Sequence, residues 1–235
     1  MPTRHSLVTG ANRGVGLEFV RQLLARGDHV VATCRKPGKA NALNALTGAH
    51  PGRLHVLPLD VADPKSRAEL VHELPLVLED GDRLGLLVNN AGILHAGERF
   101  GRLGADALDD SFRTNAAGPF LLTQALAPSL ADGARVDNIS SELGSIAGTA
   151  RFGTPSYSIS KAALNMASRL LAHALADRGI AVVALHPGWV RTDMGGAQAA
   201  VAPEDSVRGL LAVIDGLDAA RSGGYYDWQG RALPW

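Results

Sequence analysis

The sequence has few of the features that mark secreted, membrane-bound or metal-binding proteins. Among its 235 residues there is one cysteine, Cys34, so no internal disulfide can form, which fits a reducing compartment. No apolar run approaches the roughly 20 residues that a membrane span needs, and the first residues lack the pattern of a signal peptide. The eight histidines are scattered without metal-ligand spacing. We therefore expect a metal-free cytoplasmic protein with no membrane partner.

An excess of charge of either sign is also missing. Lys plus Arg and Asp plus Glu both total 23, so the net charge is zero. No basic field favours nucleic acid as a partner, and no acidic tail favours disorder. The hydrophobic fraction of 46% and the charged fraction of 20% instead predict one globular domain over residues 1–235 with a large core.

Short runs rich in Val, Leu and Ile alternate with helical stretches along the whole chain. The predicted strands are Ser6–Thr9, His29–Cys34, Leu54–Leu59, Leu84–Val88, Ala134–Ile139, Ala181–Leu185 and Gly224–Asp227. The predicted helices are Val15–Arg26, Lys39–Leu46, Pro64–Leu78 with a break at Pro75, Ala105–Leu130, Tyr157–Asp177 and Glu204–Leu217. This alternation predicts an α/β fold, a doubly wound parallel sheet of about seven strands with helices on both faces. Such sheets bind ligands at the carboxyl ends of their strands.

A glycine-rich turn joins the first strand to the first helix. Gly10, Gly14 and Gly16 are spaced G-x-x-x-G-x-G, which lets the backbone turn tightly and approach a diphosphate at the helix N-terminus. A tight connection without a ligand is the alternative, but the position after the first strand favours a dinucleotide site.

The end of the second strand indicates which dinucleotide binds. An acidic residue there would bind the ribose 2′-hydroxyl of NAD, but the chain has Arg35 and Lys36, and Arg13 lies in the glycine-rich turn. Two guanidinium groups suit a 2′-phosphate. We therefore expect NADP(H); the alternative is that Arg35 and Lys36 are only solvated. Asp60, at the end of the third strand, would bind the adenine amino group or cap a helix.

Tyr157 and Lys161 are one helical turn apart, so their side chains share a face. A nearby cation favours phenolate and lowers the phenol pKa toward the pH where acid–base catalysis is effective. Taken alone, the pair is more often a surface phenol beside a solvated lysine, so the assignment depends on the rest of the chain.

In order and spacing, these motifs resemble the short-chain dehydrogenases/reductases along nearly the whole chain. The resemblance rests on Thr9–Gly16, Asp60-Val61, Asn89–Gly92, Asn115, Ser140-Ser141, Tyr157, Lys161 and Pro187-Gly188. Within the family the chain looks closest to the carbonyl reductases of the Sniffer type and the C-factor-like proteins, through residues 140–146, 186–196 and 230–235.

The resemblance implies a role for each matching residue. Tyr157 would be the general acid, Lys161 would hold the nicotinamide ribose, and Ser141 would bind the substrate oxygen. Asn115 would hold a water molecule that links Lys161 to solvent. The residues implied in cofactor binding are Gly10, Asn12, Arg13, Gly14, Val15, Gly16, Arg35, Asp60, Val61, Asn89, Ala91, Gly92, Tyr157, Lys161, Pro187, Gly188, Val190 and Thr192. Ser140 and Ser145 are alternatives to Ser141.

Two features depart from the common family pattern. Ser141 and Tyr157 lie farther apart than usual, a lengthening that the carbonyl-reductase branch shares. Asp137 falls in the middle of a strand where the family has an apolar residue. A buried carboxylate is costly unless it is paired, so we expect a donor beside Asp137 or an exposed strand end.

The substrate side is less determined. Residues 195–201 are small and flexible in composition and form either a lid or a mobile loop. Leu94, His95, Phe152 and Trp189 are candidates for an apolar pocket. The helix that contains Tyr157 is apolar on more than one face, although a wholly intramolecular core would look similar. Family members pair through this helix and the long helix that contains Asn115, which implies a homodimer or homotetramer.

The leading hypothesis is therefore an NADPH-dependent oxidoreductase that converts a ketone or aldehyde to an alcohol, reversibly. A catalytically quiet protein of the same fold that senses nicotinamide or signals is the alternative. An epimerase or dehydratase is disfavoured by the glycine spacing and by the short region available for substrate binding.

Overall fold

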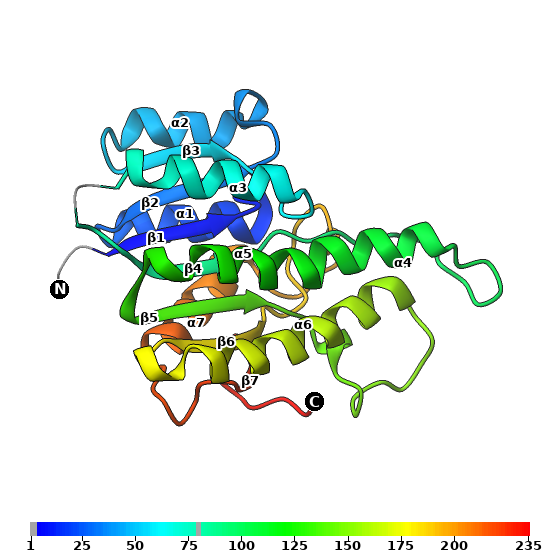
Figure 1. The fold of residues 1–235 in the computed structure, drawn as a ribbon. Helices are drawn as coiled ribbons and strands as arrows, with labels where there is room; N and C mark the ends of the chain where they lie inside the picture. The colour runs from blue at the N-terminus through cyan, green and yellow to red at the C-terminus, as the bar shows by residue number, and fades with distance from the viewer. Residues whose placement is uncertain (1–3, 79–80) are drawn as a thin grey trace.

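The computed structural model describes residues 4–78 and 81–235. Its centre is a sheet of seven parallel strands in the order β3-β2-β1-β4-β5-β6-β7 (Figure 1). The strands are β1 (His5–Thr9), β2 (His29–Cys34), β3 (Leu54–Pro58), β4 (Leu84–Asn89), β5 (Leu130–Ile139), β6 (Ala181–His186) and β7 (Tyr225–Asp227). The chain reverses its direction across the sheet after β3, so β1 and β4 are neighbours. The predicted doubly wound parallel sheet is confirmed.

Helices cover both faces of this sheet. One face carries α1 (Gly14–Ala25), α2 (Asn41–Ala49) and α7 (Pro203–Asp215), and the other carries α3 (Pro64–Glu73), α5 (Gly118–Leu126) and α6 (Pro155–Ala174). Successive strand residues point to opposite faces, so Val8 packs with the first set and Leu7 with the second. A central strand such as β4 is therefore buried on both faces and is mostly apolar.

Local signals explain several helix boundaries. Asp63 caps α3 by accepting a hydrogen bond from the Lys65 amide at 3.0 Å, and Pro64 occupies the first helical position. The helix gives way to a 3₁₀ turn at Leu74–Leu76 that contains Pro75, which confirms the predicted break.

The predicted long helical segment over roughly Ala105–Leu130 is confirmed, but it is not one regular α-helix. Helix α4 (Ala105–Phe112) is followed by a π-helical turn over Arg113–Ala117 and then by α5. Pro119 has no N–H to donate to the carbonyl of Asn115, four residues earlier, so the regular α-helical pattern cannot continue there. After α5, a 3₁₀ turn at Ala127–Ser129 ends the helical segment, and Leu130 already belongs to β5.

Neither expectation for Asp137 holds. Its side chain is fully buried on β5 between Val88 of β4 and Val183 of β6. Neither carboxyl oxygen has a hydrogen-bond partner among the described residues. Burial therefore raises the pKa of Asp137 well above its ordinary value, because the charged form is poorly solvated.

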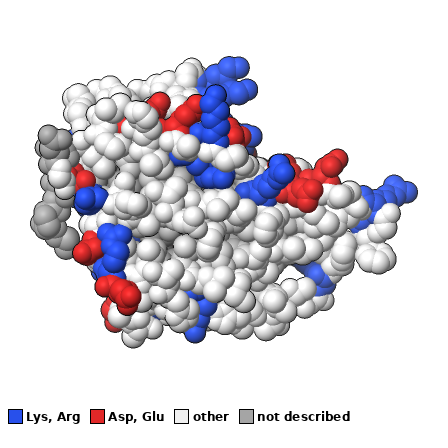
Figure 2. All heavy atoms as spheres, viewed as in Figure 1, with Lys and Arg blue, Asp and Glu red and all other residues white. Residues whose placement is uncertain are grey.

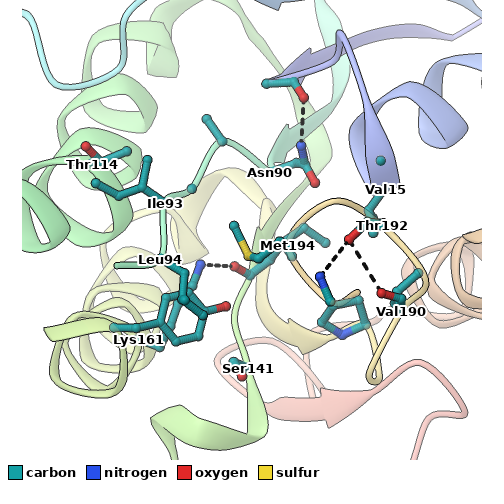
Figure 3. Close-up of a pocket in the computed structure, with 18 of the residues that line it drawn as sticks. Val15, Asn90, Ile93, Leu94, Thr114, Ser141, Lys161, Val190, Thr192 and Met194 are labelled. Carbon is teal, nitrogen blue, oxygen red and sulfur yellow. Dashed lines mark hydrogen bonds between the residues drawn. The ribbon is translucent and has the colours of Figure 1, made fainter. Parts of the chain in front are cut away.

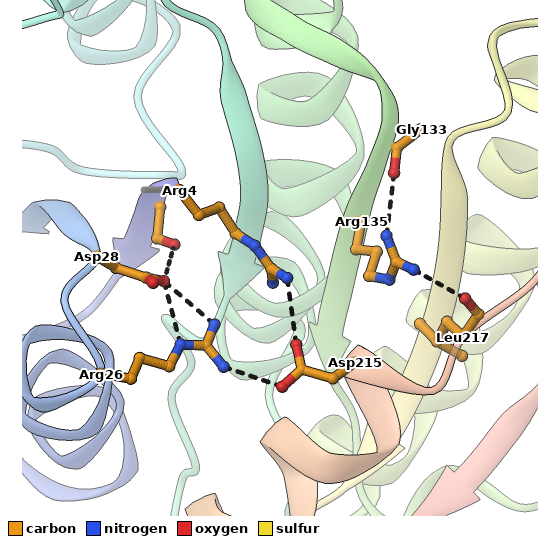
Figure 4. Close-up of polar contacts among 8 residues, drawn as sticks. Arg4, Arg26, Asp28, Gly133, Arg135, Asp215 and Leu217 are labelled. Atoms are coloured by element: carbon orange, nitrogen blue, oxygen red, sulfur yellow. Dashed lines mark hydrogen bonds and ion pairs between the residues drawn. The ribbon is translucent and has the colours of Figure 1, made fainter. Parts of the chain in front are cut away.

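A polar cluster closes the fold at the amino ends of the strands (Figure 4). The Arg26 guanidinium bridges Asp28 and Asp215, both at 3.1 Å, and Arg4 reaches the same Asp215 carboxylate at 3.3 Å. The cluster joins β1, the end of α1 and the end of α7. The candidate site residues predicted from the sequence lie at the opposite edge of the sheet, at the carboxyl ends of the strands.

Candidate active site

A cavity of about 450 Å³ opens at the carboxyl ends of the strands. In Figure 3, Leu94, Ser141 and Lys161 lie at one end of it, and Val15, Val190 and Thr192 lie at the other. Most of the predicted site residues line it: Gly10, Asn12, Arg13, Gly14, Val15, Arg35, Asp60, Val61, Ala91, Gly92, Ser141, Tyr157, Lys161, Pro187, Gly188, Val190 and Thr192. Gly16, Asn89 and Asn115 are not among its lining residues.

The glycine-rich turn is packed tightly against the end of β4. Gly10 has φ of +63°, and a Cβ there would lie 2.8 Å from the Ala91 Cα. A Cβ on Gly16 would lie 2.4 Å from the Asn90 amide nitrogen. That nitrogen donates to the carbonyls of Thr9 and Gly10, at 2.9 and 3.2 Å. Gly16 therefore allows the turn to pack closely against Asn90, although it does not itself line the cavity.

Asn90, rather than Asn89, is the asparagine of this motif that faces the turn and the cavity. The Asn89 side chain is buried, and its amide nitrogen donates to Thr123 at 3.0 Å and to Asn138 at 2.8 Å. Asn89 thus ties β4 to α5 and β5 in the core. Adjacent strand residues face opposite sides, so the motif alone did not show which asparagine lies at the cavity.

Tyr157 and Lys161 lie on one face of α6, as their spacing predicts. Their exposed fractions are 8% and 3%. The Lys161 Nζ atom lies 5.5 Å from the centre of the Tyr157 ring and donates to the carbonyl of Ile139 at 2.7 Å. That carbonyl, at the end of β5, fixes the ammonium group inside the cavity.

Burial governs the protonation of both groups. It raises the pKa of Tyr157 to about 12, with the Ser141 side chain acting in the opposite direction. It lowers the pKa of Lys161 to about 8. Desolvation of the buried phenolate is thus the larger influence on the Tyr157 pKa, and the hydrogen bond with Ser141 is the opposing one.

The structure distinguishes the three candidate serines. Ser140 also lines the cavity, but its hydroxyl is buried and donates to the Asn165 side chain at 2.6 Å. Ser145 is not among the residues that line the cavity, and its hydroxyl accepts from the Gly148 amide at 2.9 Å. Ser141 lines the cavity, and its hydroxyl accepts from the Leu143 amide at 3.2 Å. As an acceptor there, it keeps its own proton available for a ligand.

Asn115 lies in the π-helical turn and holds two segments together. Its Oδ1 accepts from the Ile93 amide at 2.8 Å, and its Nδ2 donates to the Ile93 carbonyl at 2.9 Å and to Ser160 at 3.0 Å. Both amide hydrogens are therefore in use. The group at Asn115 that lacks its regular helical donor is the backbone carbonyl, because Pro119 follows.

At the substrate end, Leu94 and Trp189 line the cavity as predicted, while His95 and Phe152 are not among its lining residues. Phe152 instead contacts Phe100 edge to face, 5.8 Å between ring centres. Further apolar lining residues that were not predicted from the sequence include Ile93, Leu143 and Met194. They are found only once the loops after β4, β5 and β6 are placed together.

The loop after β6 is held in place at several points. The Trp189 indole donates to the Gly195 carbonyl at 2.8 Å, and Val201 and Trp189 are joined by a backbone hydrogen bond of 2.9 Å. Asp193 pairs with Arg13 of the glycine-rich turn at 3.2 Å. The segment 195–201 is therefore anchored beside the cavity.

Within residues 4–78 and 81–235, no three His, Cys, Asp or Glu side chains are grouped to hold a metal ion. None of the described helices is long and apolar enough to cross a membrane.

Comparisons with known proteins agree with this geometry. The model of the family described as short chain dehydrogenase matches residues 4–201. C-signal from Myxococcus xanthus is 44% identical over 152 residues, which is 64% of this chain and 92% of that protein. The crystal structure of NADPH-bound carbonyl reductase from chicken fatty liver superimposes with a TM-score of 0.94 at 39% identity and covers 100% of both chains. Carbonyl reductase Sniffer of D. melanogaster gives a TM-score of 0.94 at 34% identity over 99% of this chain and 100% of that one.

The strand order, the glycine-rich turn, the Tyr157–Lys161 pair and the matched family model agree in one assignment. The chain is a Rossmann-fold protein that belongs to the short-chain dehydrogenase family of oxidoreductases.

Proposed function

We propose that the protein is an NADP(H)-dependent carbonyl reductase that converts a ketone or aldehyde to an alcohol, reversibly, with Tyr157 as general acid. The observation that carries this proposal is the position of Tyr157, Lys161 and Ser141 around one cavity that extends to the glycine-rich turn. The likeness to an NADPH-bound carbonyl reductase along the full chain supports it.

The cavity fits a nicotinamide dinucleotide phosphate at both ends. Gly10 and Gly14 adopt positive φ and present backbone rather than side chains to the cavity. Arg35 is exposed at the cavity edge, where a guanidinium suits a 2′-phosphate. At the other end, a Cβ on Gly92 would lie 3.6 Å from Lys161 Nζ, so the missing side chain leaves space above the ammonium. Bound there, the reduced cofactor supplies the hydride.

The residues of the chain supply the proton and the orientation. The Ser141 hydroxyl donates a hydrogen bond to the substrate oxygen, which stabilises the negative charge that develops there. The Tyr157 phenol, protonated at neutral pH because its pKa is about 12, gives its proton to the same oxygen. Lys161 keeps most of its positive charge at pH 7, since its pKa is about 8, and holds the cofactor ribose.

NADPH oxidation with a panel of small aldehydes and diketones tests this function. We expect turnover by the native protein and none by Tyr157→Phe, which keeps the ring and removes the proton donor. NADPH binding, followed by its fluorescence, should survive the substitution. Turnover retained in Tyr157→Phe would remove the general acid from the proposal.

A signalling protein of the same fold is the second candidate, favoured by the 44% identity to C-signal. In that case the protein would bind the nicotinamide cofactor but would not reduce carbonyl compounds. Neither the native protein nor Tyr157→Phe would then oxidise NADPH. The intact set of Tyr157, Lys161, Ser141 and Asn115 favours catalysis, because a sensor can dispense with it.

The site belongs, in our proposal, to a homodimer or homotetramer built on α4, α5 and α6. Ile159, Met166 and Leu170 form a stripe on α6 at helical spacing, and each is more than half exposed. Phe112 and Leu121 add apolar surface on α4 and α5. Figure 2 shows few charges over the middle of this face. Met166→Glu should shift the light-scattering mass toward the monomer, whereas Leu76→Glu, at an exposed leucine elsewhere, should not.

A further inference from the structure

The position of Ser141 is supported by contacts that involve two residues far along the sequence, Tyr225 and Trp235. We propose that Tyr225 is a positioning residue for Ser141, and that Trp235 holds Tyr225 and the loop after Ser141 in place. The proposal rests on the proposed function insofar as Ser141 binds the substrate oxygen.

The first contact in this chain of support is a buried hydrogen bond. Tyr225 lies on β7, and its exposed fraction is 2%. Its phenol donates to the main-chain carbonyl of Ser141, in the loop that follows β5. Because β6 separates β5 from β7 in the sheet, the phenol reaches across one strand to fix the peptide that carries the Ser141 side chain. Burial raises the pKa of the Tyr225 phenol above its ordinary value, so it remains a donor at working pH.

The second contact is made by Trp235. After β7 the chain folds back on itself: the Leu233 amide donates to the Tyr225 carbonyl at 2.9 Å, and Tyr226 and Ala232 form an antiparallel bridge. This brings the Trp235 ring onto the Tyr225 ring, with 5.3 Å between centres and 26° between planes. Stacked aromatic pairs at this separation are stabilising, and the indole restricts the phenol to one orientation.

Trp235 also contacts the loop itself. Its backbone oxygen accepts a hydrogen bond from the Ala147 amide at 2.9 Å. The opposite side of the loop is fixed by α6, where Asn165 donates to the Gly144 carbonyl at 3.2 Å. A Cβ on Gly144 would lie 2.8 Å from the Lys161 carbonyl carbon. The loop is thus held between the helix that carries Tyr157 and the strand that carries Tyr225.

This arrangement sets the distance between the two groups that act on the substrate oxygen. The α6 contacts hold the middle of the loop near Lys161, and the Tyr225 bond holds its first residue. The same carbonyl also accepts from the Gly144 amide at 2.8 Å, so without the Tyr225 bond it keeps only this contact within its own loop. The Ser141 peptide can then shift with the loop, and its hydroxyl is displaced from the oxygen that Tyr157 protonates. Small displacements of an orienting group slow chemistry more than they weaken binding.

Tyr225→Phe tests the proposal, because it removes the hydroxyl and keeps the stacked ring. We expect kcat to fall about tenfold, with the dissociation constant of NADPH unchanged. The matched control is Tyr226→Phe on the same strand, whose ring contacts Arg221 at 4.7 Å; its kcat should stay native. In a Ser141→Ala background, Tyr225→Phe should have almost no further effect, because residues that act through one another are not additive. Additive losses, or equal rates for Tyr225→Phe and the native protein, would overturn the positioning role.

Amide hydrogen exchange of residues 141–149 gives a readout that needs no turnover. Exchange should speed up in Tyr225→Phe and in Trp235→Ala, and Trp235→Phe, which keeps a stacked ring, should restore protection. Unchanged exchange in the first two variants would remove the support. If the native protein shows no turnover but the exchange results hold, the proposed function fails and the structural support stands. Native turnover with unchanged exchange would leave the proposed function in place and overturn the role of Tyr225 and Trp235.

Discussion

The ammonium of Lys161 is held by the carbonyl of Ile139, 2.7 Å away, and faces the Tyr157 ring from 5.5 Å. The last residue of β5 thus places the cation, and α6 places the phenol. Because both groups are almost fully buried, their protonation depends on desolvation more than on each other.

The pH dependence of the two reaction directions should differ for this reason. Reduction needs a protonated phenol, and the Tyr157 pKa of about 12 keeps it protonated, so this group should not lower the reductive rate between pH 6 and 9 (about the range of routine assays). Oxidation needs phenolate, and while the pH is below the pKa the phenolate fraction rises about tenfold for each unit by which the pH increases. We expect the oxidative kcat/KM to rise through this range. A plateau near pH 7 would show that the phenol ionises far more easily in the working enzyme.

Cofactor preference should depend on Arg35. In Arg35→Asp the guanidinium at the cavity edge is replaced by a carboxylate, which repels a 2′-phosphate and can accept from a ribose hydroxyl. We expect the ratio of kcat/KM for NADPH over NADH to fall at least tenfold (about 1.4 kcal/mol). Lys36→Asp is the matched control, because Lys36 is exposed next to Arg35 and is not among the cavity-lining residues. Equal shifts in both variants would indicate a general charge effect.

Removing the carboxyl group of Asp137 should stabilise the fold. The folded pKa of Asp137 lies above its unfolded value, so the unfolded chain loses this proton first as the pH rises, and stability decreases from about pH 4 upward. Asp137→Val, matching Val88 and Val183 beside it, should add about 1–3 kcal/mol at pH 7. The gain should shrink toward pH 4. Thermal unfolding at several pH values measures it, and a gain independent of pH would point to packing alone.

Asn115→Ala should lower both the stability of the protein and its turnover rate. It removes three hydrogen bonds that join the π-helical turn to Ile93 and Ser160, for a loss of about 2–4 kcal/mol. Ser160→Ala removes one of these bonds together with the bond from its own hydroxyl to the Tyr157 carbonyl, and should cost about 1–2 kcal/mol. Urea unfolding compares the two variants. Equal losses would mean that the contacts with Ile93 contribute little.

The sequence predicted well the features that follow from the periodicity of apolar residues and from the positions of the strand ends. Alternating apolar runs and helices indicated the sheet, and the rule that ligands bind at carboxyl ends brought Gly10, Ser141 and Tyr157 to one cavity. The π-helical turn was missed because the pattern of apolar residues continues through it, although Pro119 was a visible signal. The roles of Asn90 and Tyr225 depend on contacts between distant segments, and no local pattern contains them. Asp137 contradicts the local rule for buried strands, and the fold tolerates it.

The ion pair between Arg13 and Asp193 has a consequence for the speed of the catalytic cycle. It joins the glycine-rich turn to the loop after β6, and both residues line the cavity, so we expect a dinucleotide that enters or leaves between them to separate these two charges. An exposed pair of this kind contributes about 0–1 kcal/mol and weakens as salt is added. Where departure of the oxidised nucleotide limits the cycle, moderate salt should therefore quicken steady-state turnover, and Asp193→Asn should abolish that response.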